Sequence, residues 1–347
     1  MKPGLYRHRL LSAAAIAVAI FGRTATAPAA EGADAFYKGK TINFYIGFGG
    51  GGSYDFYARL VARYLGKYIP GNPTVVAQTM TGAGSLQLAN FLFASAPRDG
   101  TAMGTVTQTV ALEEALHSPG VRYKAAEFTW IGRATAILEI TLIGKDAKVR
   151  TIEDAKRIDT PVAGTGAGSP SEGYPRLLNA LAGTRFKVIS GYPGSAQVMK
   201  ALESGEVDGA FTSWNTLKRA QPDWLRDHKV TVLYQCALER HPDLPGVPTD
   251  VELGGSGEAR QVLAFYTSSA AIGRSILAPP GIPAERVTGL RRAFDAAIRD
   301  PEFLAEIERA QQEFQPASGE ELEMMIRSVA DVPAAIVERT QAILRAK

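Results

Sequence analysis

Short apolar runs alternate with helical stretches along this chain, and this rhythm limits its possible folds more than any other feature. The first unit has an apolar run at residues 42–48, a glycine-rich turn, and apolar side chains at helical spacing over residues 56–65. Further runs at residues 74–77 and 102–106 continue the order, with a helical stretch between them. This alternation predicts an α/β fold, in which a parallel sheet carries helices on both faces.

A second unit of the same kind occupies the middle of the chain. Strands are expected at residues 161–163, 186–189, 207–211 and 230–235, and a helix at 196–202. From residue 283 on the pattern is mostly helical, and Ser318 is suited to cap a helix that begins near Gly319.

Two segments, residues 130–143 and 262–277, can carry the chain between the units. Two crossings make the first lobe discontinuous, so we expect one lobe at 31–135 plus 265–347 and the other at 136–264. Chains longer than roughly 250–300 residues usually divide in this way. The lobes then face a cleft, and ligands of such folds bind there, at the carboxyl ends of parallel strands.

The N-terminus has the three parts of a secretory signal peptide. Lys2, Arg7 and Arg9 are positively charged, residues 10–21 are mostly apolar, and small residues follow at 25–30. A membrane anchor is the alternative, but a spanning helix needs roughly 20 apolar residues and this run is shorter. We therefore expect residues 1–30 to be a cleaved leader and the mature protein to reside in the periplasm.

Charge and cysteine content exclude several classes. The net charge is +3, and residues 1–30 hold four basic and no acidic side chains, so the mature chain carries 3 − 4 = −1. No long basic run remains, so nucleic acid is not an expected partner. Cys236 is the single cysteine, which leaves no intrachain disulfide.

The glycine-rich turn carries the clearest functional signal. Gly47, Gly49 and Gly52 satisfy G-x-G-x-x-G between a strand and a helix, the context of a dinucleotide site. A run of glycines matches that spacing easily, and an exported protein meets little nicotinamide cofactor. The favoured interpretation is an anion site, made by backbone N–H groups and a helix N-terminus. Ser53 would cap the helix and Asp55 would brace the loop; a tight turn without a ligand is the alternative.

Signatures of catalysis are missing from the sequence. It has no G-x-S-x-G, no H-E-x-x-H and no cysteine pair, and its four histidines show no ligand spacing. We therefore expect a protein that is not an enzyme and that needs no metal or cofactor. Small-residue loops at 82–84 and 164–169 follow other strands, and Trp214 follows a strand end, so these are further candidates for lining the cleft.

An ordered set of motifs resembles the receptors of the tripartite tricarboxylate transporters, also called Bug proteins. Each motif is weak alone, but the set spans nearly the whole mature chain. In order, the segments are GFGGGGSYD at 47–55, ARL at 58–60, TGAGS at 81–85, ASAPRDGT at 94–101, GYPGSA at 191–196, GEVD at 205–208, HPDLPGVPT at 241–249 and LAPPGIP at 277–283.

The resemblance implies a two-lobed periplasmic-binding-protein fold of type II, with two parallel-rich sheets, flanking helices and a cleft that closes on the ligand. It implies a monomer that binds a small organic carboxylate, such as a di- or tricarboxylate or an aromatic acid. It also implies delivery to a permease of one large and one small membrane subunit. The site residues expected are Phe48, Gly49, Gly51, Gly52, Ser53, Gly82, Ala83, Gly84, Thr107, Gly166, Ala167, Gly168, Ser169, Thr212 and Trp214.

The chain departs from the family pattern at three places. Gly50 or Gly51 stands where relatives have proline, residues 211–214 read FTSW where relatives often have F-D-N, and Glu172 lies near a position often held by histidine. These differences leave the ligand open, and Trp214 with Tyr174 would favour an aromatic or longer acid. The alternatives are an exported ligand-sensing receptor without a transport role, or a nucleotide-dependent enzyme that uses the glycine loop.

Overall fold

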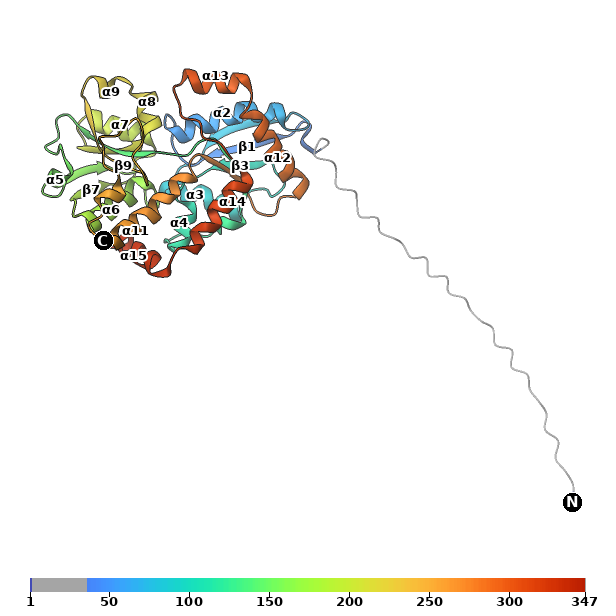
Figure 1. Cartoon of the computed structure of the whole chain (residues 1–347). Coiled ribbons are helices and arrows are strands. Elements are labelled where there is room, and N and C mark those ends of the chain that lie inside the picture. Colours follow the sequence, from blue (N-terminus) through green and yellow to red (C-terminus); the bar gives the residue numbers. More distant parts are fainter. Residues whose placement is uncertain (2–35, 347) are drawn as a thin grey trace. The chain divides into compact units, whose positions relative to one another are not determined.

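A computed structural model describes residues 36–346 together with Met1. The expected leader, apart from Met1, lies outside the described residues. The strands of residues 36–346 form two sheets, which lie next to each other with helices around them (Figure 1).

The first sheet has six strands in the order β11-β4-β10-β3-β1-β2. β1 pairs in parallel with β2 and with β3, whereas β10 pairs antiparallel with β3 and β4, and β11 pairs antiparallel with β4. The bounds are β1 Thr41–Ile46, β2 Thr74–Thr79, β3 Ala102–Thr105, β4 Thr129–Arg133, β10 Ser275–Ala278 and β11 Ala317–Ser318.

The second sheet has five strands in the order β7-β6-β8-β5-β9. β6 is parallel to β7 and β8, and β5 is antiparallel to β8 and β9. The bounds are β5 Glu139–Gly144, β6 Thr160–Ala163, β7 Phe186–Ile189, β8 Gly209–Ser213 and β9 Val230–Cys236.

Both sheets are therefore mixed, which corrects the expectation that their strands run parallel. The α/β class with two sheets is confirmed. Parallel strands need a long crossover, usually a helix, and β1, β2 and β3 are joined by α2 and α3 in this way. The strands near the crossings, β4, β5 and β10, pair antiparallel.

Helices cover both sheets, and the expected helical C-terminal part is confirmed (Figure 1). Ser318 forms a capping box with Glu321 at the start of α14, as its place in the sequence predicts. The helices are α2 Ser53–Tyr68, α3 Leu86–Ala94, α4 Val110–Ala115, α5 Ile152–Ala155, α6 Pro170–Ala182, α7 Ser195–Glu203, α8 Trp214–Ala220, α9 Asp223–Arg226, α10 Asp250–Leu253, α11 Gly257–Thr267, α12 Ala284–Ala297, α13 Pro301–Arg309, α14 Gly319–Ser328 and α15 Ala334–Arg345.

Three apolar clusters hold the layers together. One joins Phe44 of β1 to Phe294 of α12, and one packs Trp214 of α8 with the helices over the second sheet. The third contains Trp130 of the first sheet and Phe211 of the second, so the interior is continuous from one sheet to the other.

The chain crosses from the first sheet to the second between β4 and β5, and returns between β9 and β10. The expected boundary at 264/265 falls inside α11.

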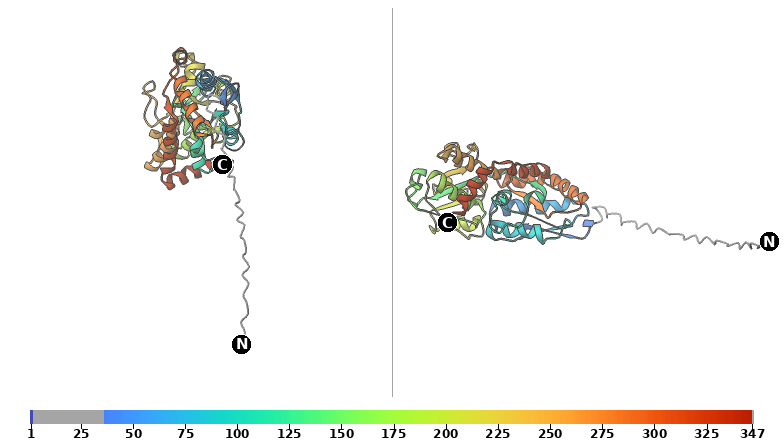
Figure 2. Two further views of the ribbon diagram at one scale, coloured as in Figure 1. Left: turned by 90° about the vertical axis from the view of Figure 1, so that its right-hand side faces the viewer. Right: turned by 90° about the horizontal axis from the view of Figure 1, so that it is seen from below.

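The C-terminal helix α15 packs on α6 and α11, so it reaches the helices of the second sheet. All three helices lie at the lower edge of Figure 1. The right-hand view of Figure 2 shows that the green-to-yellow and blue-to-cyan segments occupy different ends of this body.

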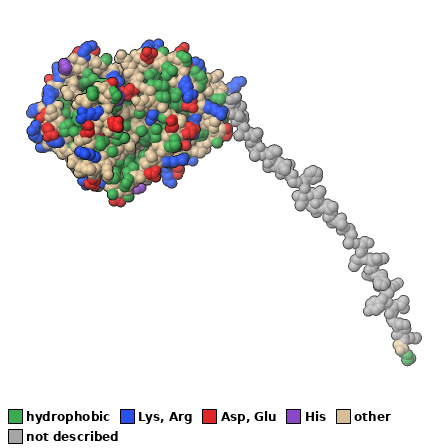
Figure 3. Space-filling model, viewed as in Figure 1, with side chains coloured by type: hydrophobic (Ala, Val, Ile, Leu, Met, Phe, Trp, Pro, Cys, Tyr) green, Lys and Arg blue, Asp and Glu red, His purple; other side chains and the backbone are tan. Residues whose placement is uncertain are grey.

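Among the described residues, no helix is both long enough and apolar enough to cross a membrane. On the face that Figure 3 shows, basic and acidic side chains are interspersed, and no large area of one sign stands out.

Candidate functional site

Two cavities lie where loops from the two sheets meet. We call them the Glu113 cavity, with a volume of about 160 Å³, and the Phe48 cavity, of about 370 Å³. Ala83, Gly84 and Ala167 line both, so the contact between these two loops separates one cavity from the other.

Gly84 and Gly166 allow that contact. A Cβ atom on Gly84 would lie 2.8 Å from the carbonyl oxygen of Ala167 and 2.9 Å from the nitrogen of Ser169. A Cβ atom on Gly166 would lie 2.9 Å from the nitrogen of Gly84. Both glycines also have positive φ angles, which other residues rarely adopt. The loops after β2 and β6 can approach this closely only because neither position carries a side chain.

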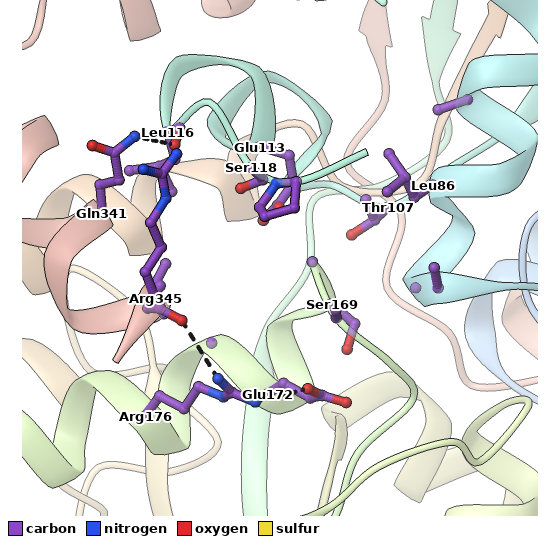
Figure 4. A pocket seen from close by; sticks show the side chains of 18 of the residues that line it. Leu86, Thr107, Glu113, Leu116, Ser118, Ser169, Glu172, Arg176, Gln341 and Arg345 are labelled. Atoms are coloured by element: carbon purple, nitrogen blue, oxygen red, sulfur yellow. Dashed lines mark hydrogen bonds and ion pairs between the residues drawn. The ribbon is translucent and has the colours of Figure 1, made fainter. Parts of the chain in front are cut away.

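The walls of the Glu113 cavity come from loops and helices that flank the two sheets (Figure 4). Thr107, after β3, lies on one side, and Ser169, the N-cap residue of α6, lies on the other. The Thr107 and Thr109 hydroxyls are 2.7 Å apart, and the Thr109 hydroxyl donates to the carbonyl of Gly168 at 2.6 Å. This bond ties the end of the first sheet to the loop that opens α6.

Acidic side chains also face the Glu113 cavity. Glu113 of α4 is only 7% exposed, and burial raises the pKa of its carboxyl group, an effect that Ser118 partly offsets. A Cβ atom on Gly168 would lie 3.1 Å from Glu113 Oε2, so the absence of a side chain there leaves room for the carboxyl. Glu172 of α6 pairs with Arg176 at 3.5 Å and accepts a hydrogen bond from Ser190.

The first glycine loop packs directly on the second lobe. The Gly49 N–H donates to the Pro193 carbonyl at 2.8 Å, and the Ser53 N–H donates to Thr216 Oγ1 at 3.0 Å. The Gly51 N–H donates to Asp55 Oδ2 at 3.2 Å, so this carboxylate braces the loop from within. The anion-site hypothesis expects N–H groups of this loop to bind a ligand, but those of Gly49, Gly51 and Ser53 are already bonded to other groups of the protein.

The expected cap of α2 is wrong. Gly52 is the N-cap residue, and no side chain caps the helix. The hydroxyl of Ser53 lies instead 3.1 Å from that of Ser213 and accepts a hydrogen bond from Arg274 at 2.9 Å. Ser53 is buried, so its hydroxyl bonds to these neighbours and not to the helix backbone.

Nine of the fifteen expected ligand-binding residues line one or both cavities. They are Phe48, Gly82, Ala83, Gly84, Thr107, Gly166, Ala167, Gly168 and Ser169. Those that line neither are Gly49, Gly51, Gly52, Ser53, Thr212 and Trp214.

The two aromatic candidates lie in the packed interior of the second lobe. Trp214 is 6% exposed, and its indole N–H donates to Asp243 at 2.9 Å. Tyr174 is fully buried and stacks on Phe211, with ring centroids 5.4 Å apart. Neither residue lines the Glu113 or the Phe48 cavity.

A buried ion pair that sequence reasoning missed lies at the crossings between the lobes. Arg274, before β10, lies 3.5 Å from Glu139 at the start of β5, and also donates to Gln108 at 2.9 Å. Its guanidinium stacks 3.7 Å from the ring centre of Tyr54. Burial raises the pKa of Glu139, and Arg274 offsets part of that increase. The local sequence offered one sign of this ion pair, because Glu139 and Arg274 each stand beside an apolar run.

One acidic cluster lies away from both cavities. His241, Asp243 and Glu313 have ligand atoms within 4.8 Å of one another. The Lys218 ammonium lies 3.3 Å from Asp243 and 3.2 Å from Glu313, so both carboxylates already share one cationic partner. The histidine spacing in the sequence did not reveal this cluster, because Glu313 comes from a distant part of the chain.

Solved structures that share this fold include periplasmic binding proteins. The structure of the periplasmic binding protein BugD matches with a TM-score of 0.70 and 22% identity, over 88% of this chain and 98% of that one. MatC from Rhodopseudomonas palustris, solved with bound malate, matches with a TM-score of 0.65 and 22% identity, over 88% and 99%. These likenesses show the fold: it is the two-lobed fold of periplasmic binding proteins.

Sequence comparison places the chain within that class. The profile of the tripartite tricarboxylate transporter family receptor matches residues 58–341. The UPF0065 protein in the tcbD-tcbE intergenic region of Pseudomonas sp. (strain P51) is 26% identical over 329 residues, which cover 88% of this chain and 92% of that protein. The chain belongs to the tripartite tricarboxylate transporter receptor family. Its family and fold are those of substrate-binding receptors, as the sequence motifs predict.

Proposed function

We propose that this protein is a periplasmic receptor that binds a small organic carboxylate between its two lobes and delivers it to a two-subunit membrane permease. It acts as a monomer, and ligand binding needs no metal, cofactor or nucleic acid. The observation that carries the proposal is the meeting of the Gly82–Gly84 and Gly166–Ser169 loops at the walls of two cavities.

Backbone groups make the cleft suitable for an anion. Ser169 is the N-cap residue of the 13-residue helix α6, and the N-terminus of such a helix is the positive end of its dipole. Pro170 has no N–H and the Ser169 N–H donates to the Gly166 carbonyl at 3.1 Å, so the helix would act here through its dipole. Gly84 and Gly168 keep side chains out of the way, so a carboxylate can approach the main chain closely. MatC, which shares the fold, was solved with malate, a carboxylate.

The size of the Glu113 cavity limits the ligand. Pockets for drug-sized ligands usually measure about 300–1,000 Å³. At about 160 Å³ this cavity suits a small organic acid. The residues proposed to bind it are those of the expected set that line the two cavities, from Thr107 on one side to Ser169 on the other.

Two lobes would close on the ligand, with boundaries at 31–135 plus 265–347 and at 136–264. The sheet memberships support this division, because β1–β4, β10 and β11 form one sheet and β5–β9 the other. The glycine loop would then act at the closing edge, where Gly49 bonds to Pro193 across the cleft.

Export would remove the leader at residues 27–30, since small residues there offer the cleavage sites. Intact-mass measurement of periplasmic protein should show a chain that lacks the leader. A full-length chain recovered from the cytoplasm would contradict export.

The direct test is a thermal-shift screen of the exported protein with small mono-, di- and tricarboxylates and aromatic acids, each beside its primary amide. A ligand at 100 times its dissociation constant adds about 2.7 kcal/mol to the free energy of unfolding, so its melting temperature should rise by several degrees. The amides should have little effect. Amides that stabilise the protein as much as their acids would contradict carboxylate recognition.

A further inference from the structure

The Glu113 cavity contains an acid without a cationic partner. Glu113 is only 7% exposed, lines the cavity and forms no ion pair with any Lys, Arg or His of residues 36–346. An isolated carboxylate is costly to remove from water, and buried charges in proteins are normally paired. A carboxyl group avoids this cost when it keeps its proton, so burial raises the pKa of Glu113, an effect that Ser118 partly offsets.

The cationic side chains that line the cavity have other partners. Arg176 pairs with Glu172 at 3.5 Å. Arg345 donates to the carbonyl of His117 at 2.7 Å. In Figure 4 both arginines lie to the left of Glu113. The arginines of the cavity therefore give Glu113 no counter-ion.

The other described groups near Glu113 give it no counter-ion either. Tyr123 and Tyr266 line the cavity, and burial raises the pKa of both phenols, so they stay neutral. Glu114, on the same helix, accepts a hydrogen bond from the Ala125 N–H at 2.6 Å and does not line the cavity. The charged and titratable side chains at the end of α4, after it, and on the segments that pack against it are exposed and do not line the cavity. They are His117, Arg122, Lys124, Glu127 and Asp331.

We propose that Glu113 binds the ligand as a neutral carboxylic acid that donates a hydrogen bond to it, so that binding takes up one proton from the solvent when the free carboxyl group is ionised. The inference rests on the proposed function, because it takes the ligand to be an anion held at the Gly84 backbone. Glu113 and Gly84 line the same cavity of about 160 Å³. Two carboxylates that share so small a site cannot both stay ionised, because each disfavours the charge of the other.

A protonated Glu113 also has a positive role in binding. A carboxylic acid that burial keeps neutral is a hydrogen-bond donor at neutral pH, and it repels no anion. Gly168 leaves space beside the carboxyl group, since a Cβ atom there would lie 3.1 Å from Glu113 Oε2. Glu113 therefore selects for an acceptor oxygen on the ligand, and its protonation sets the affinity.

The affinity should depend on pH with a definite sign. Below the pKa of the free Glu113 carboxyl group the proton is already present, so the affinity does not change with pH. Above that pKa a proton has to bind together with each ligand, so the affinity falls about tenfold per pH unit. Buried carboxyl groups reach pKa values of about 8–9, so measurements up to pH 9.5 include the transition.

Calorimetric titrations from pH 6.5 to pH 9.5 test the inference. The probes are benzoate, 3-phenylpropionate and glutarate, whose carboxyl groups are ionised throughout this range. For each probe that binds, the wild type should lose affinity about tenfold per pH unit at the alkaline end. Glu113→Gln carries an amide that stays neutral and donates at every pH, so its affinity should stay constant.

Proton uptake is the second readout. Titrations in two buffers that differ in ionisation enthalpy give the number of protons bound per ligand. At the alkaline end the wild type should take up about one proton per ligand and Glu113→Gln none. The count for the wild type tests the inference even where Glu113→Gln binds no probe.

Two glutamine variants are the matched controls. Glu127 is exposed, pairs with Lys124 at 3.3 Å and does not line the cavity. Glu172 is the other acid of the cavity and already has Arg176 as its partner at 3.5 Å. Glu127→Gln and Glu172→Gln should both keep the fall of affinity with pH. Circular dichroism of each variant at each pH verifies the fold.

The outcomes separate the two proposals. A wild-type affinity that is independent of pH, or a fall that survives in Glu113→Gln, would overturn the neutral acid and leave the carboxylate receptor standing. A fall that is lost in Glu172→Gln and kept in Glu113→Gln would assign the proton to Glu172, which also overturns the inference. If neither these probes nor any acid of the thermal-shift screen binds, the proposed function fails, and this inference fails with it.

Discussion

Gly84→Ala addresses the contact between the two lobes. Gly84 has a φ angle of +62°, and an added Cβ would lie 2.8 Å from the Ala167 carbonyl oxygen and 2.9 Å from the Ser169 nitrogen. Both are backbone atoms of the opposite lobe and cannot swing aside as a flexible side chain would. The loops can relieve the clash only if the lobes move apart, so the variant should disfavour the closed form.

Two effects of different size follow. The left-handed backbone conformation costs an alanine roughly 1–2 kcal/mol of folding stability. A carboxylate held from both sides loses contacts when the lobes part, and each hydrogen bond to a charged group is worth roughly 1.5–3 kcal/mol. The loss of one such bond weakens binding about ten- to a hundredfold at 1.4 kcal/mol per decade.

Gly183→Ala separates the two effects. Gly183 follows α6 with a φ angle of +74°, and a Cβ added there would meet no atom within 4 Å. Both variants should therefore lose similar stability in urea unfolding. Calorimetry with the best carboxylate from the screen should show weakened binding in Gly84→Ala and wild-type affinity in Gly183→Ala. Equal affinities in both variants would refute the claim that the ligand is held at this contact.

Three further variants test neighbouring parts of the account. A Cβ on Gly52 would lie 3.1 Å from Ser195 Oγ. Gly52→Val should therefore hinder closure of the loop on the second lobe and weaken ligand binding. A calorimetric affinity equal to that of the wild type would contradict this. Arg274→Leu should lower the free energy of unfolding by about 3–5 kcal/mol in urea, because it leaves Glu139 buried without its partner. The double variant with Glu139→Leu should regain much of that loss. A double variant no more stable than the single one would show that the pair does not act as a unit. Burial raises the pKa of Glu113 above its ordinary value of 4.5, so its ionisation destabilises the folded state increasingly as the pH rises through the folded-state pKa. Glu113→Gln without ligand should accordingly raise the melting temperature more at pH 8 than at pH 4.5, and a gain independent of pH would argue against a buried charge.

The sequence predicts the α/β class and most parallel strands because their signals are local. The strand expected at residues 186–189 matches β7, and the helix expected at 196–202 differs from α7 by one residue at each end. Apolar runs bounded by glycine or proline identify such elements without knowledge of their neighbours. The direction of pairing depends on distant partners, so the antiparallel strands β4, β5 and β10 were expected only as connecting segments.

The site was predictable to a smaller extent, for a related reason. Glycine loops at strand ends identify where the backbone can approach a ligand, and Gly84 and Gly168 line the Glu113 cavity. Which N–H groups are already bonded depends on the opposite lobe, as the bond from Gly49 to Pro193 shows. Glu113 and Glu114 stand side by side in an otherwise apolar stretch, and local pattern does not reveal that Glu113 faces a cavity between two lobes.

A crystal structure of the exported protein with its best carboxylate ligand tests the central claim most directly. The account predicts the carboxylate between the two sheets, within hydrogen-bond distance of the backbone N–H of Gly84, which lines the Glu113 cavity. A carboxylate bound at the outer surface of either lobe, with the contact between Gly84 and Gly166 unchanged, would contradict it.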